Sequence, residues 1–238
     1  MLKAVTFDLW NTLIQVKDYT EPRVKCLADA LNEMGLSREC DEIRQAYRAS
    51  HEYVHKIWRE ENHRHVSAEE RLNHILKTLS VELPVNVKRH VLKEMRGFIV
   101  SDPPLLVEGV TETLEILNPK YKMGIISDTG MAPGNLLRKV LVGYRVLRFF
   151  DIAVFSDVVG FYKPHRLMFE TALTHLKVKP FESIHIGDLL QTDIVGAKAI
   201  GMKAIWFNKK GNVNNIQHKA DYEIRKFPEI INILNTIP

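Results

Sequence analysis

The sequence predicts an α/β protein that is built on a parallel β-sheet and carries an α-helical insertion after its first strand. Two observations lead to this expectation. From about Pro103 to the end, short apolar runs alternate with helical patterns, an order typical of right-handed βαβ units in a sheet covered on both faces. Between Gln15 and Ser101, helical patterns dominate and strand-like runs are scarce.

The first strand is predicted within Lys3–Leu13, whose sequence is KAVTFDLWNTL. A short apolar, partly β-branched run of this kind is typical of a buried strand in a parallel sheet. The run delivers Asp8 and then reaches the turn-forming residues Asn11 and Thr12. An acid at the carboxyl end of such a strand lies where open α/β sheets place their chemistry. The alternative is that Asp8 only caps a loop.

The inserted segment is expected to form four helices. Periodic apolar residues place them at 23–34, 40–61, 68–79 and 86–99. Start and stop signals agree with this assignment, because Pro22 suits a first turn, Gly35 a helix end, and Ser67 with Glu70 a capping pair.

The second half is expected to alternate strictly between helices and strands. The predicted helices are 110–117, 136–147, 167–176, 194–200 and 228–234, and the predicted strands are 122–127, 152–155, 183–187, 203–207 and 222–224. We therefore expect a core domain of residues 1–14 and 102–238 and a helical cap domain of residues 15–101. A cap inserted there would lie above the strand ends and is a candidate lid.

Composition narrows the class of protein. A net charge of +4 without a dense Lys/Arg block does not indicate nucleic-acid binding, but it suits a small anionic substrate. Cys26 and Cys40 match neither a zinc motif nor a disulfide framework, which fits a reducing compartment. The first residues have a strand pattern, and no apolar run has the length of a membrane span. We expect a cytoplasmic monomer or homodimer.

Four predicted strand ends carry residues that could take part in catalysis or ligand binding. They are Asp8, Trp10 and Thr12, then Ser127, Asp128 and Thr129, then Lys163 before a helix, and finally Asp188 and Asp193. A carboxylate can attack an electrophilic phosphorus or carbon and form a covalent intermediate that water hydrolyses. Hydroxyl groups can hold an anionic oxygen, and an ammonium can neutralise charge on nucleophile and substrate. A helix cap (Ser127) or a surface lysine (Lys163) would be the plainer interpretation.

The ordered set of motifs resembles the haloacid dehalogenase-like hydrolase superfamily across the whole chain. Its motifs are an apolar-Asp-x-x-x-Thr run, a Ser or Thr after a strand, a Lys before a helix, and Gly-Asp-x-x-x-x-Asp. They match Asp8 with Thr12, Ser127, Lys163 and Gly187–Asp193. The resemblance implies a Rossmann-like core with a helical cap, and it implies that Asp8 is the nucleophile, with Thr12, Ser127 and Lys163 as catalytic partners.

The resemblance also implies a magnesium ion. In the family's phosphatases, residues matching Asp8, Asp188 and often Asp193 surround Mg²⁺, and the residue at the position of Trp10 supplies a backbone carbonyl. The expectation has a physical basis, because crowded carboxylates raise one another's pKa and a hard divalent cation relieves their repulsion.

Trp10 departs from the phosphatase pattern. Family phosphatases usually carry a second Asp there, which protonates the leaving alkoxide, and such general acid catalysis is typically worth about 10²–10⁴-fold. The family's metal-free 2-haloacid dehalogenases have an aromatic residue at this position instead. They also need an arginine from the cap to hold the halide, for which Arg44 and Arg48 are candidates. Asp188 opposes that reading, because dehalogenases carry neutral residues in their fourth motif.

Three hypotheses follow. The first is a Mg²⁺-dependent phosphohydrolase acting on a small phosphorylated substrate. The second is a metal-independent 2-haloacid dehalogenase, and the third is a non-catalytic binding protein on the same scaffold. In either enzyme, Trp10, Asp128, Thr129, Arg44 and Arg48 are the candidates for substrate binding.

Overall fold

The computed structural model describes residues 1–213 and 220–237 and divides into two compact units. The core unit comprises Met1–Val16, Pro104–Asp128 and Leu141–Pro238, and the helical unit comprises Lys17–Pro103 and Thr129–Val140. The segment 129–140 thus groups with the inserted helices although it follows them in the sequence. The exact boundaries of 14/15 and 101/102 between a core and a cap domain stay a prediction.

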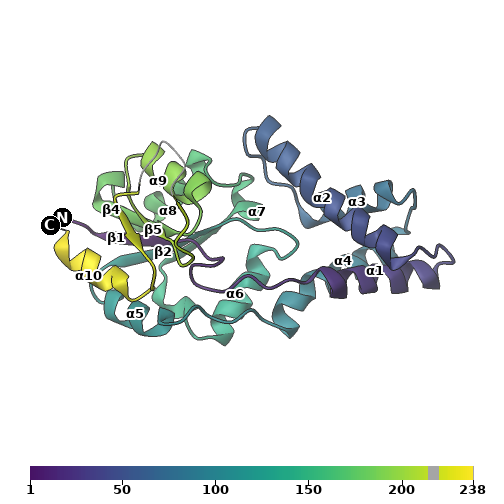
Figure 1. Cartoon of the computed structure of the whole chain (residues 1–238), viewed down its shortest axis with the longest axis horizontal. Coiled ribbons are helices and arrows are strands. Elements are labelled where there is room, and N and C mark those ends of the chain that lie inside the picture. Colours follow the sequence, from purple (N-terminus) through teal and green to yellow (C-terminus); the bar gives the residue numbers. More distant parts are fainter. Residues whose placement is uncertain (214–219, 238) are drawn as a thin grey trace. The chain divides into compact units, whose positions relative to one another are not determined.

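The core unit contains a six-stranded parallel sheet, which confirms the α/β class (Figure 1). Its strands are β1 (Ala4–Phe7), β2 (Lys122–Ser127), β3 (Ile152–Phe155), β4 (Ser183–Gly187), β5 (Lys203–Phe207) and β6 (Tyr222–Ile224). Their spatial order is β3-β2-β1-β4-β5-β6. The chain therefore builds outward from β1 in one direction and then in the other, which makes the β1–β4 boundary a topological switch point.

The register of the central strands brings their polar carboxyl ends together. Phe7 in β1 is paired with Ile125 in β2 and with Ile186 in β4. The backbone N–H of Asp8 then donates to the Ile186 carbonyl at 2.8 Å. Side chains that follow these strands are thus delivered to one edge of the sheet, where ligands bind in open α/β folds.

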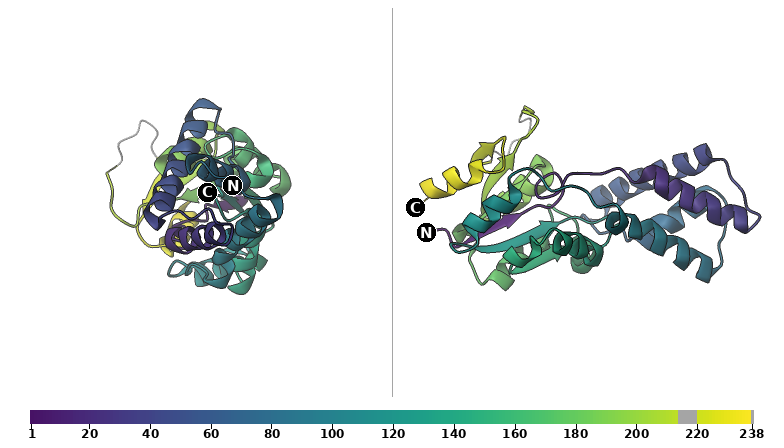
Figure 2. Two further views of the ribbon diagram at one scale, coloured as in Figure 1. Left: turned by 90° about the vertical axis from the view of Figure 1, so that its right-hand side faces the viewer. Right: turned by 90° about the horizontal axis from the view of Figure 1, so that it is seen from below.

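Helices cover both faces of the sheet (Figures 1 and 2). They are α5 (Val110–Leu117), α7 (Ser156–Val159), α8 (Arg166–Leu176), α9 (Val195–Ala199) and α10 (Glu229–Thr236). On the face of α8 and α9, Met168 and Phe169 are buried in an apolar cluster with β2 and β5 residues. On the opposite face, the Phe7 ring lies 5.9 Å from Phe227 and 6.0 Å from Phe150. Both faces are therefore dry, as the continuous apolar strands predicted.

One helix is shorter than the sequence predicts. Helix α6 covers Gly134–Gly143, whereas the apolar pattern predicts a helix to Leu147. Arg145 adopts a left-handed conformation (φ 59°), and Val146 and Arg145 donate backbone hydrogen bonds to Leu141 and Val142. This is a Schellman stop, which glycine usually provides. No glycine marks this stop, because arginine occupies the left-handed position.

The helical unit is organised by four long helices (Figure 2). They are α1 (Thr20–Glu33), α2 (Cys40–Glu60), α3 (Ala68–Thr78) and α4 (Val85–Ser101), close to the predicted bounds. The side-chain oxygen of Ser67 accepts a hydrogen bond from the Glu70 N–H, which confirms the predicted cap of α3. Met131 joins the buried apolar cluster of these helices, which explains why 129–140 belongs with them. In the described ranges, no helix combines the length and the apolar character needed to cross a bilayer.

Candidate active site

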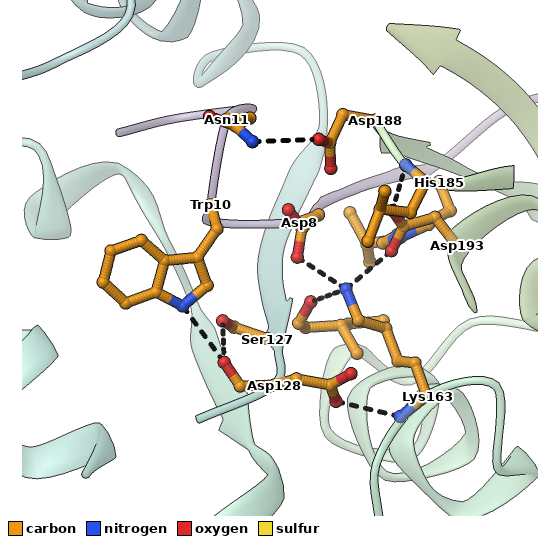
Figure 3. A network of polar contacts seen from close by, with 12 residues as sticks. Asp8, Trp10, Asn11, Ser127, Asp128, Lys163, His185, Asp188 and Asp193 are labelled. Atoms are coloured by element: carbon orange, nitrogen blue, oxygen red, sulfur yellow. Dashed lines mark hydrogen bonds and ion pairs between the residues drawn. The ribbon is translucent and has the colours of Figure 1, made fainter. Parts of the chain in front are cut away.

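A buried lysine links two acids that follow neighbouring strands at one edge of the sheet (Figure 3). The Lys163 side chain is only 2% exposed. Its ammonium donates to Asp8 Oδ1 at 2.5 Å, to Asp193 Oδ1 at 2.6 Å and to the Ile126 carbonyl at 2.9 Å. Asp8 and Lys163 are far apart in the sequence, so their meeting depends on the strand order of the sheet.

Asp193 is held in place by its own loop. The chain leaves β4 at Gly187 and makes a turn of π-helix at Leu190–Ile194. A Cβ on Gly187 would lie 2.3 Å from the carboxyl carbon of Asp193, so only glycine leaves room for this side chain. The second carboxylate oxygen of Asp193 accepts from the Leu189 N–H at 2.9 Å. The acid therefore stabilises the turn and binds Lys163 at the same time.

Asp188 completes a group of three acids. Oxygen atoms of Asp8, Asp188 and Asp193 all lie within 4.8 Å of one another. Two residues beside this group hold Asp188: Asn11 donates to its Oδ2 at 3.3 Å, and the Trp206 indole donates to its backbone carbonyl at 3.0 Å.

One ammonium does not neutralise three crowded carboxylates, and the pKa values reflect this. Burial raises the pKa of Asp8 well above its usual range, and the charges of Asp193 and Asp188 add to the effect of burial. Burial and Asp193 also raise the pKa of Asp188 to about 6. Burial alone would lower the pKa of Lys163, but the charges of Asp193 and Asp8 outweigh burial and raise it. The ammonium thus stays charged.

Asp128 positions the loop that carries Lys163 (Figure 3). Its Oδ1 accepts from the backbone N–H of Lys163 at 2.9 Å, and burial raises its pKa to about 7. Its backbone carbonyl accepts from the Ser127 hydroxyl at 3.0 Å and from the Trp10 indole at 3.1 Å. Ser127 and Trp10 thus meet at the backbone carbonyl of Asp128, and all three residues were predicted from the sequence to take part in catalysis or substrate binding.

Thr12 contributes a buried hydroxyl. Its Oγ1 is inaccessible and has no hydrogen-bond partner within the described chain. A buried polar group without a partner costs roughly 1–3 kcal/mol. A bound anionic oxygen would offset that cost.

The remaining proposed substrate-binding residues belong to the helical unit. Arg44 on α2 forms ion pairs with Glu21 (2.7 Å) and with Asp41. Arg48, also on α2, is exposed, and Thr129 is buried. Their part in substrate binding stays a prediction.

His185 was not identified from the sequence. It is fully buried in β4; its Nε2 lies 3.4 Å from Asp193 Oδ1, and its Nδ1 lies 2.9 Å from the Thr6 hydroxyl. Because a carboxylate only accepts, Nε2 carries the proton and the Thr6 hydroxyl donates to Nδ1. Burial lowers the pKa of His185, which keeps the ring neutral. The sequence signal that could have identified His185 is a polar residue inside the otherwise apolar strand SIHIG.

The acidic group fits a hard divalent cation. Within the described residues, Lys163 is the only hydrogen-bond partner of the Asp8 carboxylate, so this group retains lone pairs for a cation. Together with Asp188 and Asp193, it forms an all-oxygen donor set with excess negative charge, which is the chemistry that Mg²⁺ selects. Trp10 offers a carbonyl two residues after Asp8, as the resemblance implies.

The parallel sheet and the carboxylate–lysine centre at its switch point define an α/β enzyme. The family model of the haloacid dehalogenase-like hydrolases matches residues 2–201. The chain therefore belongs to the haloacid dehalogenase-like hydrolase family, and the resemblance inferred from its four motifs is confirmed.

Two curated relatives carry the same name. The glyceraldehyde 3-phosphate phosphatase of Methanothermobacter thermautotrophicus is 30% identical over 212 residues, which cover 88% of this chain and 87% of the relative. The glyceraldehyde 3-phosphate phosphatase of Pyrococcus furiosus is 38% identical over 138 residues. This match covers 54% of this chain and 54% of the relative, so the chain spans about half of that relative's length.

Solved structures show the same fold. A HAD (haloacid dehalogenase-like) phosphatase from Thermococcus onnurineus is 26% identical with a TM-score of 0.66, and the match covers 98% of both chains. A 2-haloacid dehalogenase from Pseudomonas syringae is 24% identical with a TM-score of 0.75 and covers 99% of both chains. The latter similarity concerns the fold alone.

Proposed function

We propose that this chain is a Mg²⁺-dependent phosphohydrolase that acts on a small phosphorylated substrate through a covalent aspartyl intermediate on Asp8. The observation that carries the proposal is the clustering of Asp8, Asp188 and Asp193 around a single lysine. The phosphatase names of the relatives support the substrate class.

Asp8 supplies the attacking atom. Its Oδ2 bonds to phosphorus while the bond from phosphorus to the leaving oxygen breaks, and the leaving group takes up a proton from water. Water then attacks phosphorus while the bond from phosphorus to Asp8 Oδ2 breaks, so that phosphate leaves with both protons of the water and the Asp8 carboxylate is restored. Lys163 holds Asp8 Oδ1 at 2.5 Å and thereby fixes the direction of Oδ2. The hydroxyl of Thr12 is a donor for a phosphoryl oxygen, and the hydroxyl of Ser127 becomes one when it turns away from the Asp128 carbonyl.

Asp8, Asp188, Asp193 and the Trp10 carbonyl are the residues that would hold the metal. When bound, Mg²⁺ offsets the charge of the acids and the phosphoryl group and favours the ionised form of Asp8. The raised pKa values of Asp8 and Asp188 support this role, because carboxylates that resist ionisation gain most from a cation.

Trp10 restricts the leaving group. The indole N–H is engaged with the Asp128 carbonyl, and indole has no acidic proton to give at neutral pH. We therefore expect the enzyme to prefer leaving groups that need no proton, such as aryl or acyl phosphates, over simple alkyl esters.

The proposal is tested with p-nitrophenyl phosphate. Wild-type enzyme with Mg²⁺ should release p-nitrophenol, EDTA should stop the reaction, and readdition of Mg²⁺ should restore it. Asp8→Asn should abolish turnover while the protein remains folded by circular dichroism. Equal turnover by Asp8→Asn and wild type would exclude Asp8 as the nucleophile.

A second candidate is a metal-free 2-haloacid dehalogenase, which the aromatic residue at position 10 favours. In that reaction Asp8 displaces halide from carbon, and no leaving-group proton is needed. Release of chloride from 2-chloropropionate in the presence of EDTA, together with no release of p-nitrophenol, would select this function instead. A cytoplasmic location and a monomeric or homodimeric state stay predictions for both candidates.

A further inference from the structure

Two polar side chains lie next to each other in the apolar interior of the core unit. Thr6 in β1 and His185 in β4 are register partners on neighbouring parallel strands, and both are fully buried. The Thr6 hydroxyl lies 2.9 Å from Nδ1 of the imidazole. One ring nitrogen of His185 is therefore satisfied inside the sheet, and the other is left to face Asp193.

The imidazole of His185 is also held by an aromatic ring. The Phe169 ring on α8 lies 5.3 Å from the imidazole, with an angle of 84° between the two planes. Phe169 in turn packs tightly against α9, where a Cβ on Gly196 would lie 2.3 Å from its ring. Packing and the Thr6 hydroxyl together fix the orientation of the imidazole.

The second nitrogen of His185 points at the acid that binds the active-site lysine (Figure 3). His185 Nε2 lies 3.4 Å from Asp193 Oδ1, and the same oxygen accepts from the Lys163 ammonium at 2.6 Å. The other oxygen of Asp193 accepts from the Leu189 N–H at 2.9 Å. His185 therefore acts on the carboxylate oxygen that contacts Lys163.

The position of Asp193 matters most after Asp8 has reacted. The Lys163 ammonium contacts both carboxylates. In the covalent intermediate, Asp8 Oδ2 is bonded to phosphorus, so Asp8 no longer carries its negative charge. Asp193 remains a charged partner of the ammonium, and its place decides where Lys163 lies while water attacks.

We propose that His185 is a positioning residue for the hydrolytic reaction: its Nε2–H, oriented by Thr6, holds Asp193 and through it Lys163 in line with Asp8. Residues that orient a charged group from behind are often as important as the group itself. As a role in catalysis this inference rests on the proposed function, whereas the hydrogen-bonded chain from Thr6 to Lys163 does not.

The tautomer of His185 is the first test. The ¹⁵N signals of the imidazole are recorded by NMR on the full chain and assigned with His185→Leu. The geometry requires a proton on Nε2 and none on Nδ1, because the Asp193 carboxylate only accepts hydrogen bonds. A proton found on Nδ1 instead would overturn the proposal.

The second test is kinetic and uses p-nitrophenyl phosphate with saturating Mg²⁺. His185→Leu removes the donor and should lower kcat about 10- to 100-fold with little change in KM, because the nucleophile is misaligned. His185→Gln places an amide N–H near the former Nε2 and should restore much of kcat. His175→Gln, the same change at an exposed position of α8, is the control and should behave like wild type.

Thr6→Val tests the same chain without touching the imidazole. It keeps the volume and removes the hydroxyl that orients the ring, so kcat should fall about 3- to 10-fold, as expected for loss of one uncharged hydrogen bond. In the His185→Leu background it should have no further effect on kcat, because Thr6 acts only through the ring. Thr113→Val is the control, since the buried Thr113 hydroxyl has no hydrogen-bond partner within the described chain.

A readout without turnover separates this inference from the proposed function. The ¹⁵N signal of the Lys163 ammonium, assigned with Lys163→Gln, should shift in His185→Leu and return toward its wild-type value in His185→Gln. If this occurs while wild-type enzyme does not hydrolyse p-nitrophenyl phosphate, the proposed function fails and the positioning role stands.

Two further results would overturn the positioning role. The first is an ammonium signal of Lys163 that is the same in wild type and His185→Leu. The second is an equal loss of kcat in His185→Leu and His185→Gln when thermal unfolding shows both variants to be folded, because position 185 would then supply shape and not an N–H donor.

Discussion

A Cβ on Gly187 would lie 2.3 Å from the carboxyl carbon of Asp193, closer than side chains approach in folded proteins. Gly187 is the last residue of β4, and Asp193 is the acid that pairs with Lys163. The small residue at the strand end is therefore a condition for the ion pair, because any larger residue would displace the carboxylate.

Gly187→Ala should lower both stability and activity. Forcing a methyl group into a filled site costs roughly 1–3 kcal/mol, and the displaced Asp193 would lose its short contact with Lys163. Thermal unfolding and kcat/KM for p-nitrophenyl phosphate measure the two effects. Gly97→Ala on α4 is the matched control, since its Cβ meets nothing within 4 Å. It should be neutral or stabilising by up to about 1 kcal/mol. Wild-type behaviour of Gly187→Ala would show that the loop adapts freely.

Asp128 should make the protein less stable as the pH rises. Burial raises its folded-state pKa from 3.8 to about 7. A carboxyl with a raised pKa binds its proton more tightly in the folded state, so its contribution is complete below pH 4 and is lost as the pH approaches 7. The loss amounts to at most about 4 kcal/mol.

Asp128→Asn should remove this part of the pH dependence, because asparagine keeps an oxygen acceptor for the Lys163 N–H. Urea unfolding at several pH values between 4 and 7 measures the difference. Asp29→Asn, an exposed position on α1, should follow the wild-type profile. Parallel profiles for Asp128→Asn and wild type would contradict the raised pKa.

Trp10→Asp should increase phosphatase activity toward alkyl phosphates. A carboxylic acid at this position could protonate the leaving oxygen, an effect typically worth about 10²–10⁴-fold when geometry is ideal. The rate should fall above the pKa of the new acid, which the wild-type profile does not show. Trp10→Phe, which removes the indole hydrogen bond to Asp128 without adding an acid, is the control. An unchanged ratio of alkyl to aryl phosphate activity would exclude leaving-group protonation at this position.

Mg²⁺ should raise the thermal stability of the wild-type protein. A ligand that binds only the folded state stabilises it by about 2.7 kcal/mol at a hundredfold excess over its Kd. Asp188→Asn, which removes one of three clustered carboxylates, should reduce the shift in Tm. Asp221→Asn, in a partly exposed pair with Lys198, serves as the control and should retain the shift. A Tm that is insensitive to Mg²⁺ in wild type would argue for the dehalogenase reading.

The alternation of apolar runs and helical patterns was sufficient to predict the parallel sheet, because strands buried on both faces are almost purely apolar. The meeting of Asp8, Lys163 and Asp188 was also predictable, since parallel strands end at one edge of the sheet. The end of α6 at Gly143 was not, because the left-handed turn that stops the helix uses Arg145 instead of glycine.

Other features of the site depend on tertiary contacts that no local pattern encodes. His185 looks like a misplaced polar residue in an apolar strand until Asp193 and Thr6 are seen beside it. The burial of Arg23 and Arg71 was equally hidden, because it becomes visible only in the packed helices.

The chain passes between its two compact units four times, at 16/17, 103/104, 128/129 and 140/141. The helical unit is therefore made of two separate chain segments, and it cannot be removed by cutting the chain at only two points. A fragment ending at Pro103 would lack Met131 and leave an apolar gap among its own helices. A chimera that places these helices on the core of another family member would also have to include residues Thr129–Val140.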